Sequence, residues 1–503
     1  MPQTSAPARP AALRADEVVA VLPWRWNTQG AIFLIGGLGF MFDAWDVALN
    51  GFLIPLLSDH WDLTLGQAAW IATANLIGMA TGAVVWGGMS DRIGRKTAFT
   101  LTLLVFSLFT VLGAFAPNIL LFCIFRFFAG FGLGGCIPVD YALVGEFTPA
   151  KHRGRVLTAM DGWWPIGVTL CAFVSAWLLD FGDWRLIMLI MVLPALLIVL
   201  VRIFIPESPM YLISAGQYDK ADAILRRLVA RTGSDITEWH YEGLGPAAAA
   251  TASSTSATAG PAPTTDPTPE AGIGVQRRGV LGRVAALTGQ IAELWRYSAR
   301  VTFTAWLLFV AVLVLYYAAL TWLPKILREQ GLGDQAAFIV TGQMTAIGIA
   351  GVVLCALLVE LTGRKWMLGT TSVVAAVALV GFAIALDSSG AELNGAAKFS
   401  ILAFGFFIQM AIPALYTYVS ELYPTRLRGS GFGWASAASR VATGVAPVVF
   451  GSLMWPVLGL TWTFVITGAF VVLAALVMAF ATPETTGQEL ERRTAHPRRR
   501  GAG

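Results

Sequence analysis

Two aspartates lie inside a long apolar stretch near the N-terminus, where a charged side chain is costly. Asp43 and Asp46 are three residues apart and so lie on nearly one face of a helix. Arg126 lies at a similar depth in another apolar stretch. An apolar environment favours a protonated carboxyl group, whereas a neighbouring arginine favours the carboxylate. This opposition predicts proton coupling at Asp46 and Arg126, with Asp43 as a second candidate; the alternative is a buried ion pair that only joins two helices.

A second buried cation is expected at Arg440, about nine residues into a later apolar stretch. An unpaired guanidinium at this depth is expensive, so Arg440 needs an acidic partner or an anionic substrate. Asp161 lies at a similar depth in the N-terminal half and is the candidate partner. Both roles remain open, and a switch between them is compatible with each.

Other polar and aromatic side chains inside apolar stretches could contact a substrate. Most aromatic residues of a membrane protein face lipid or pack between helices, whereas an amide gains little by facing hydrocarbon, so the glutamines are the stronger candidates. The candidates are Trp45, Tyr141, Trp163, Trp164, Tyr316, Tyr317, Gln343, Gln409, Tyr416 and Trp434.

The elements that position these residues are expected to be membrane-spanning helices. The 503 residues are 56% hydrophobic and 13% charged, about half the charged share of soluble proteins. Twelve stretches of about 17–25 mostly apolar residues are each long enough to cross a bilayer. We therefore predict an all-α polytopic membrane protein with spans at 29–52, 67–88, 97–116, 118–144, 157–179, 184–205, 299–323, 337–359, 366–386, 397–419, 431–454 and 461–481.

The spans form two groups of six. The expected divisions are an N-terminal tail 1–28, a bundle 29–205, a linker 206–298 whose middle 245–272 is too polar to order itself, a bundle 299–482 and a C-terminal tail 483–503. No signal peptide is expected, because no apolar core precedes a cleavage site in 1–28. Most Lys and Arg residues fall in the tails, the linker and the loops on one side, which predicts that both termini and the linker are cytoplasmic.

Three loop motifs recur in both halves. Asp91-Arg92-Ile93-Gly94-Arg95-Lys96 corresponds to Glu360-Leu361-Thr362-Gly363-Arg364-Lys365. Glu146-x-x-Pro149-x-x-x-Arg153 corresponds to Glu421-x-x-Pro424-x-x-x-Arg428, and Pro206-Glu207-Ser208 to Pro483-Glu484-Thr485. The offsets are nearly equal, which indicates a duplicated six-helix unit. Repeats with a binding site at their interface are typical of secondary transporters.

These motifs resemble those of the major facilitator superfamily, in particular its sugar-porter-related branch. Sequences such as Phe-Asp-Ala-Trp-Asp-Val and Ser439-Arg440 are similar to nicotinate permeases and metabolite:proton symporters, and more distantly to synaptic vesicle glycoproteins and organic-ion transporters. The resemblance implies two pseudo-symmetric six-helix bundles that rock around a central site, and an anion-binding role for Arg440. Met210 and Asp140 depart from the pattern and bear on the substrate rather than on the fold.

The resemblance also implies a cytoplasmic gate that latches the bundles in the outward-open state. The alternative is that its basic residues only satisfy the positive-inside rule. Acids and glycines at matched positions favour the latch. The gate residues are Asp91, Arg92, Arg95, Glu146, Arg153, Glu360, Arg364, Glu421 and Arg428.

We therefore predict a proton-coupled importer of a small organic acid, such as nicotinate, in a bacterial plasma membrane. It is expected to act as a monomer in contact with its substrate and the lipid bilayer. The alternatives are a sugar or polyol:proton symporter, a drug or metabolite:proton antiporter, and a receptor without transport. An enzyme is not expected, because nucleotide loops, metal clusters and nucleophile motifs are missing. The small net charge of +4 does not support nucleic-acid binding. The four cysteines contain no CxxC pair, which does not support a zinc site. No cofactor is expected, and the proton is the expected coupling ion.

Overall fold

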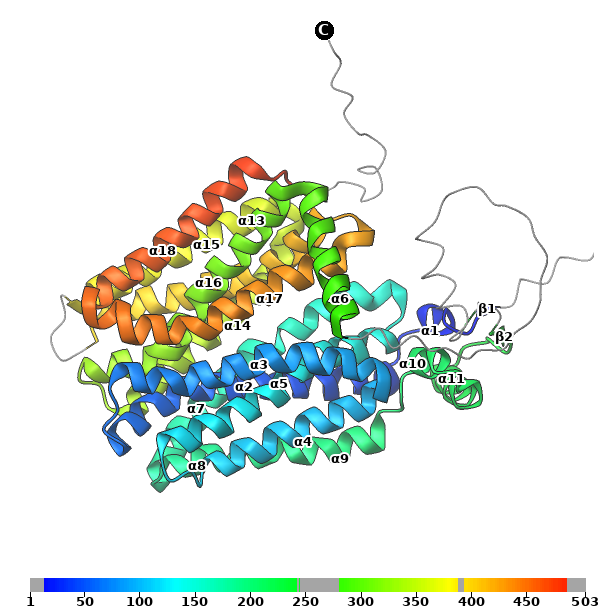
Figure 1. Ribbon diagram of the computed structural model, residues 1–503, viewed down its shortest axis with the longest axis horizontal. Coiled ribbons are helices and arrows are strands. Elements are labelled where there is room, and N and C mark those ends of the chain that lie inside the picture. The colour runs from blue at the N-terminus through cyan, green and yellow to red at the C-terminus, as the bar shows by residue number, and fades with distance from the viewer. Residues whose placement is uncertain (1–12, 242–243, 245–279, 388–392, 486–503) are drawn as a thin grey trace, which may run out of the picture.

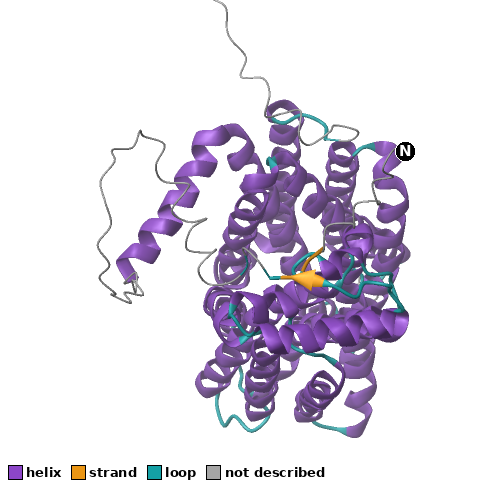
Figure 2. Ribbon diagram, turned by 90° about the vertical axis from the view of Figure 1, so that its right-hand side faces the viewer, coloured by secondary structure: helices purple, strands orange, loops and turns teal. Residues whose placement is uncertain are grey.

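The computed structural model describes residues 13–241, 244, 280–387 and 393–485, and these are almost entirely helical (Figures 1 and 2). The expected tether 245–272 and all but the first residues of the C-terminal tail lie outside the described residues. The four cysteines are all free.

The N-terminal half contains six crossings. Two of them are interrupted: the fifth is divided at Gly162, and the sixth contains a 3-10 turn. The elements are η1 (Trp26–Gly30) with α2 (Ala31–His60), α3 (Leu65–Ile93), α4 (Arg95–Gly113), α5 (Ile119–Phe147), α6 (Ala150–Asp161) with α7 (Trp163–Leu178) and η2 (Leu179–Phe181), and α8 (Trp184–Leu189) with η3 (Ile190–Val192) and α9 (Leu193–Phe204).

The C-terminal half repeats this order. Its first helix has an extended residue at Ser298, at the boundary expected between linker and bundle, and its last helix is broken at Gly459, which has a φ of 79°. The elements are α13 (Val280–Glu329), α14 (Asp334–Thr362), α15 (Arg364–Asp387), α16 (Gly395–Leu422), α17 (Thr425–Val449), η4 (Phe450–Met454) and α18 (Trp455–Ala481).

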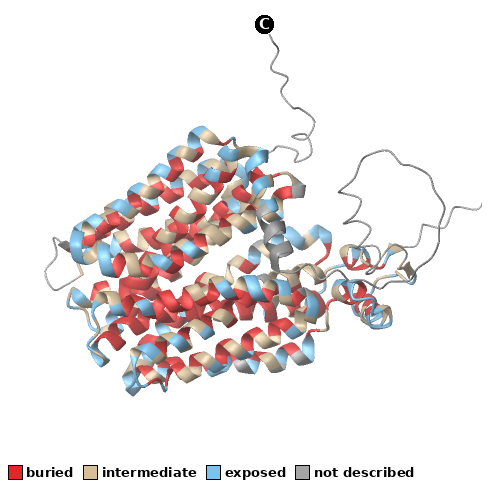
Figure 3. Cartoon of the chain, viewed as in Figure 1, coloured by how far each residue is buried: buried red, intermediate tan, exposed pale blue. Residues whose placement is uncertain are grey.

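The described helices agree with twelve crossings. Ten helical segments are long and apolar enough to span a membrane. One of them, Leu427–Ala481, has 55 residues and therefore contains two crossings, and Trp184–Ile198 is a shorter apolar helix. Figure 3 shows buried residues concentrated where the two bundles meet, while apolar side chains such as Val84, Leu120 and Phe480 are exposed on the outside. Such a surface is suited to lipid.

A small linker subdomain lies beyond one end of the bundles in Figure 1. It contains α1 (Val18–Val21), α10 (Pro209–Ser214), α11 (Tyr218–Thr232) and two short parallel strands, β1 (Leu13–Arg14) and β2 (Trp239–His240). The strand pair is the one departure from the all-α prediction in the described chain. We call this end of the molecule the linker end and the opposite end, with loops 61–64 and 330–333, the far end.

Small residues bring α3 and α5 close together. Gly78 and Gly82 on α3, and Gly130 and Gly134 on α5, are each four residues apart, and each lies against backbone of the other helix. A Cβ at Gly130 would overlap the carbonyl oxygen of Asn75. This close packing of small residues four apart is frequent in membrane helices. It sets the positions of Asn75 and Arg126 relative to α2.

Candidate functional site

Asp46 and Arg126 form a buried ion pair between α2 and α5. Both side chains are fully buried, and two guanidinium nitrogens each lie 2.8 Å from a different carboxylate oxygen of Asp46. Thr110 of α4 and Asn75 of α3 each donate a further hydrogen bond of 3.1 Å to this carboxylate. Arg126 also donates from Nε to Oδ1 of Asn50 at 3.0 Å. The network joins four helices of the N-terminal half.

This saturated network favours the structural alternative for Asp46. Each carboxylate oxygen of Asp46 accepts from Arg126 and from one neutral donor. Bidentate, charge-assisted hydrogen bonds of this kind are the strong ones in proteins. Protonation of Asp46 would leave the guanidinium of Arg126 buried without its counterion, which is strongly unfavourable.

Asp43 and Asp140 have the opposite surroundings. Both side chains are fully buried, yet none of their four carboxylate oxygens has a hydrogen-bond partner among the described residues. Oδ2 of Asp140 lies 3.1 Å from the Cβ position of Gly39, one helical turn before Asp43, so α5 presents Asp140 beside α2. Cys136 of α5 lies beside Asp43, and the two carboxyl groups interact electrostatically. The sequence marked Asp140 as unusual but gave it no role.

Arg440 of α17 faces this region from the other half. It interacts electrostatically with Asp43, and with Tyr317 and Tyr416 of its own half. The alternative ion pair of Arg440 with Asp161 does not occur among the described residues, and Asp161 instead accepts a hydrogen bond from the hydroxyl of Tyr141. Asp161 ends α6 at the break in the fifth crossing, and this places its carboxylate against α5.

Tyr316 connects the two halves. Its hydroxyl accepts a hydrogen bond of 3.0 Å from Nε1 of Trp164 in the N-terminal half. It accepts another, of 3.2 Å, from the amide of Gln409 in the C-terminal half. The ring of Trp164 also lies edge-on to Tyr317, with centroids 6.2 Å apart, and 5.5 Å from the ring of Phe40.

We call the residues gathered at this interface the central cluster. It combines carboxyl groups, one guanidinium and several aromatic rings from both halves. Its members are Phe40, Asp43, Asp140, Tyr141, Asp161, Trp164, Tyr316, Tyr317, Gln409, Tyr416 and Arg440.

Four of the predicted substrate residues are not shown to join the central cluster, namely Trp45, Trp163, Gln343 and Trp434. The ring of Trp163 packs against Gly37 and lies 6.3 Å from Phe33, so it faces α2 rather than the other half. The neighbouring Trp164 instead contacts Tyr316 of the other half. Gln343 lies on α14, and its buried carbonyl oxygen has no partner among the described residues. Its amide is therefore available to a ligand, without a described contact to the cluster.

The gate residues at the linker end form matched ion pairs in the two halves. Arg95 contacts Glu146 at 3.1 Å, and Arg364 contacts Glu421 at 2.7 Å. Each pair joins two helices of the same half. The predicted latch between the bundles is therefore not formed by these pairs in this structure.

The other gate residues differ from one another. Arg92 is exposed, and the exposed Glu360 lies 3.4 Å from Arg364. Arg153 donates to the carbonyl of Thr148 at 3.3 Å. Nε and Nη2 of Arg428 are buried without a hydrogen-bond partner among the described residues. The side chain of Asp91 lies outside the described residues.

The third repeated motif has a structural role that the sequence did not indicate. Glu207 accepts a hydrogen bond of 3.0 Å from the backbone N–H of Lys96, at the start of α4. Glu484 accepts one of 3.0 Å from the N–H of Arg364, at the start of α15. The preceding glycines, Gly94 and Gly363, have φ angles of 93° and 89°. Each acid therefore caps a helix that follows a left-handed glycine.

At the far end, polar contacts do join the halves. Arg328 of α13 donates to the carbonyl of Pro55 at 2.8 Å and forms an ion pair with Asp59, both on α2. Gln335 of α14 donates to Asp180 at 3.1 Å. Within the described chain, the halves are thus tied together at the far end, while the matched gate pairs remain inside each half.

The fold and the interface between two repeated halves are those of a secondary transporter, and comparison with known proteins agrees. The model of the Major Facilitator Superfamily matches residues 36–391 and 332–501. The chain belongs to this family of membrane transporters and not to an enzyme family. Among the described residues, no group of three or more His, Cys, Asp or Glu side chains could hold a metal ion.

Several proteins named as transporters are similar to this chain along nearly its whole length. The niacin transporter NiaP of Acinetobacter baylyi is 33% identical over 463 residues, which cover 90% of this chain and 94% of that protein. The 4-hydroxybenzoate transporter PcaK of the same species is 27% identical over 464 residues, which cover 91% of this chain and 90% of that protein. The inward-open xylose transporter XylE of E. coli superimposes on this chain with a TM-score of 0.70 and is 20% identical. The match covers 93% of this chain and 99% of XylE, so the two proteins share a fold.

Proposed function

We propose that this protein imports a small aromatic monocarboxylate, such as nicotinate, together with a proton. The observation that carries the proposal is the composition of the central cluster. The guanidinium of Arg440 is close enough to Tyr317 and Tyr416 to interact with them electrostatically, and the ring of Tyr317 meets that of Trp164 across the interface. A guanidinium binds a carboxylate with planar, bidentate geometry, and aromatic side chains pack against a flat ring.

The relatives support the same substrate class. NiaP is named for niacin and PcaK for 4-hydroxybenzoate, and both compounds combine one aromatic ring with one carboxylate. The likeness to XylE concerns the fold at 20% identity and does not favour a sugar. A sugar or polyol symporter and a proton antiporter are therefore outcomes that the substrate test must exclude.

We place the proton at Asp43 rather than at Asp46. The carboxyl oxygens of Asp46 accept hydrogen bonds from Arg126 and from two neutral donors. Asp43 is buried without a hydrogen-bond partner among the described residues, and Arg440 is its cationic neighbour across the interface. A buried carboxylate needs a cation or a proton. An incoming substrate carboxylate that engages Arg440 would weaken the support for an ionised Asp43 and so couple substrate binding to proton binding.

The gate pairs fit an alternating-access cycle. We propose that the linker end is cytoplasmic. When this end closes, the four residues of the matched ion pairs would leave their partners in the same half and pair with residues of the other half. These residues are Arg95, Glu146, Arg364 and Glu421. Arg428 is available for such a contact, because its Nε and Nη2 have no hydrogen-bond partner in the described part of the chain.

The proposal is tested by uptake in reconstituted liposomes with an imposed pH gradient. Radiolabelled nicotinate should accumulate when the outside is acidic, and benzoate should compete whereas glucose and a quaternary amine should not. Competition by glucose alone would transfer the assignment to a sugar symporter. Accumulation driven by a gradient of the opposite direction would identify an antiporter.

A further inference from the structure

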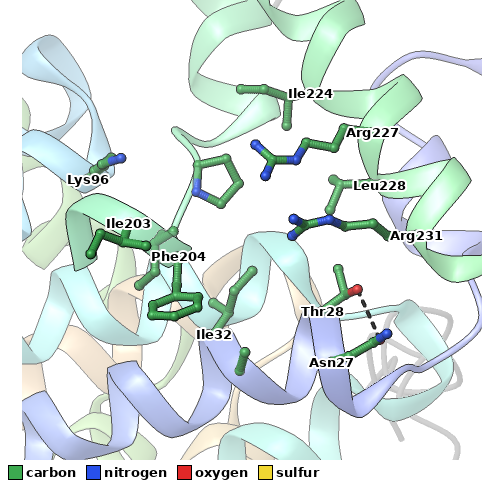
Figure 4. Close-up of a pocket in the computed structure, with 13 residues that line it drawn as sticks. Asn27, Thr28, Ile32, Lys96, Ile203, Phe204, Ile224, Arg227, Leu228 and Arg231 are labelled. Carbon is green, nitrogen blue, oxygen red and sulfur yellow. Dashed lines mark hydrogen bonds between the residues drawn. The ribbon is translucent and has the colours of Figure 1, made fainter. Parts of the chain in front are cut away.

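A polar pocket lies at the linker end, away from the central cluster. It has a volume of about 140 Å³ and lies between the start of α2, the start of α4, the end of α9 and one face of α11 (Figure 4). Its thirteen described lining residues include three cations, Lys96, Arg227 and Arg231, and no carboxylate. The transport cycle proposed above makes no use of it.

The two arginines of α11 point into this pocket. Figure 4 shows Arg227 and Arg231, one helical turn apart, directed from α11 toward the end of α9, with Lys96 on the other side. Both arginines are exposed, and neither forms an ion pair or a hydrogen bond with another described residue. The nearby Glu207 is already engaged, since its Oε1 accepts from the N–H groups of Lys96 and Ser208 at 3.0 and 3.1 Å. Arg227 and Arg231 therefore bring two positive charges to the pocket that no ion pair of the described chain neutralises.

One side of the pocket is apolar and open to the surroundings. Ile203 and Phe204, at the end of α9, are 65% and 54% exposed, although they end a membrane-spanning crossing. Ile32 and Leu228 line the inner wall and are buried. A soluble anion would use the arginines but not this apolar side. A phospholipid would use both, with its phosphate at the arginines and an acyl chain along α9.

We propose that this pocket binds the phosphate of an anionic phospholipid from the membrane leaflet at the linker end. The lipid would bridge α11 to the N-terminal bundle, because the pocket is lined by both. Each basic residue near a membrane surface contributes about 1 kcal/mol to attraction of anionic lipid, which corresponds to about fivefold in affinity.

The chain supplies a matched control. Arg226 is adjacent to Arg227 on α11 but forms an ion pair with Asp222 and lies over the ring of Trp239, away from the pocket. R226Q and R227Q each remove one charge from the same exposed helix, so they alter the overall surface charge equally. Only R227Q alters the pocket.

The test measures the thermal stability of delipidated, purified full-length protein titrated with phosphatidylglycerol or phosphatidylcholine in detergent. Phosphatidylglycerol should raise the melting temperature more than phosphatidylcholine does. The phosphatidylglycerol concentration at half-saturation should rise about fivefold in R227Q, about 25-fold in R227Q/R231Q and less than twofold in R226Q. The melting temperature without lipid checks that each variant is folded, and R227K/R231K should retain most of the binding.

Three results would overturn the proposal. Equal stabilisation by the two lipids would remove the need for an anionic headgroup. An equal shift in R226Q and R227Q would attribute the effect to diffuse surface charge. Stabilisation by inorganic phosphate at the same concentration as the lipid would identify a site for a soluble anion.

Discussion

Asp43 and Asp46 lie nearly one helical turn apart on α2, yet their carboxyl groups have different surroundings. Asp46 is neutralised by a guanidinium and accepts hydrogen bonds from Thr110 and Asn75. Asp43 shares an unpartnered, buried position with Asp140. The first setting is that of a buried ion pair, and the second is the one that we propose for the coupled proton.

The first prediction concerns stability. Asp46→Asn should destabilise the N-terminal bundle by about 3–5 kcal/mol, because it leaves Arg126 buried without a counterion. Arg126→Met should be similarly destabilising, and the double variant should recover part of the loss. Thermal unfolding in detergent measures the effect. A stable Asp46→Asn protein that has lost only uphill accumulation would restore Asp46 as the proton site.

The second prediction concerns coupling. Asp43→Asn should abolish accumulation against a gradient but retain counterflow exchange, since exchange needs no net proton movement. Its melting temperature should stay close to that of the parent, because no described hydrogen bond or ion pair of Asp43 is removed. Uptake driven by a pH gradient is compared with exchange in the same liposomes. Unimpaired accumulation would exclude Asp43 from coupling.

The third prediction concerns the substrate anchor. Arg440→Ala should lower nicotinate affinity at least about tenfold, because a hydrogen bond to a charged group contributes about 1.5–3 kcal/mol. Arg440→Lys should restore only part of it, since an ammonium lacks the planar fork. Binding is measured by ligand-induced thermal shift, with the unliganded melting temperature as the control for folding. Unchanged affinity in Arg440→Ala would exclude this anchor.

At the scale of elements, helix contacts decide which side chains meet. Trp164, and not Trp163, reaches Tyr316 across the interface, because adjacent residues at the start of α7 lie on different faces of the helix. Sequence periodicity could not separate these adjacent rings. Asp140 likewise gains its setting from the crossing of α5 and α2 at Gly39. The sequence predicts the helices and the repeats. It does not predict where two helices pack together, because that depends on contacts between distant segments.

The fourth prediction tests the packing of α3 and α5. Gly130→Ala should destabilise the protein by about 1–3 kcal/mol, because the added methyl group overlaps the carbonyl of Asn75 and forces the helices apart. Gly88→Ala on α3 is the control, since nothing lies within 4 Å of its Cβ position. Alanine is the better helix former, so this control should be neutral or slightly stabilising. Equal melting temperatures for both variants would contradict the packing argument.

At the scale of the whole molecule, the two ends are in different states. Arg328 and Gln335 join the halves at the far end, whereas the pairs Arg95–Glu146 and Arg364–Glu421 stay inside each half at the linker end. The repeated motifs identified these gate residues, but a sequence does not specify which of two conformations the chain adopts. The partner of an exchangeable side chain depends on that conformation.

The last prediction follows from this asymmetry. Contacts that tie the far end favour the present arrangement, so Arg328→Ala should shift the population toward states with an open far end. Arg428→Ala should do the opposite, because it removes a cation available to close the linker end. Spin labels placed across each end, on loops 61–64 and 330–333 and on residues 148–149 and 423–424, measure the distances between halves. In the alternating-access cycle that we propose, each variant should lengthen distances at one end and shorten them at the other. A change of the same sign at both ends would mean that the bundles separate rather than rock.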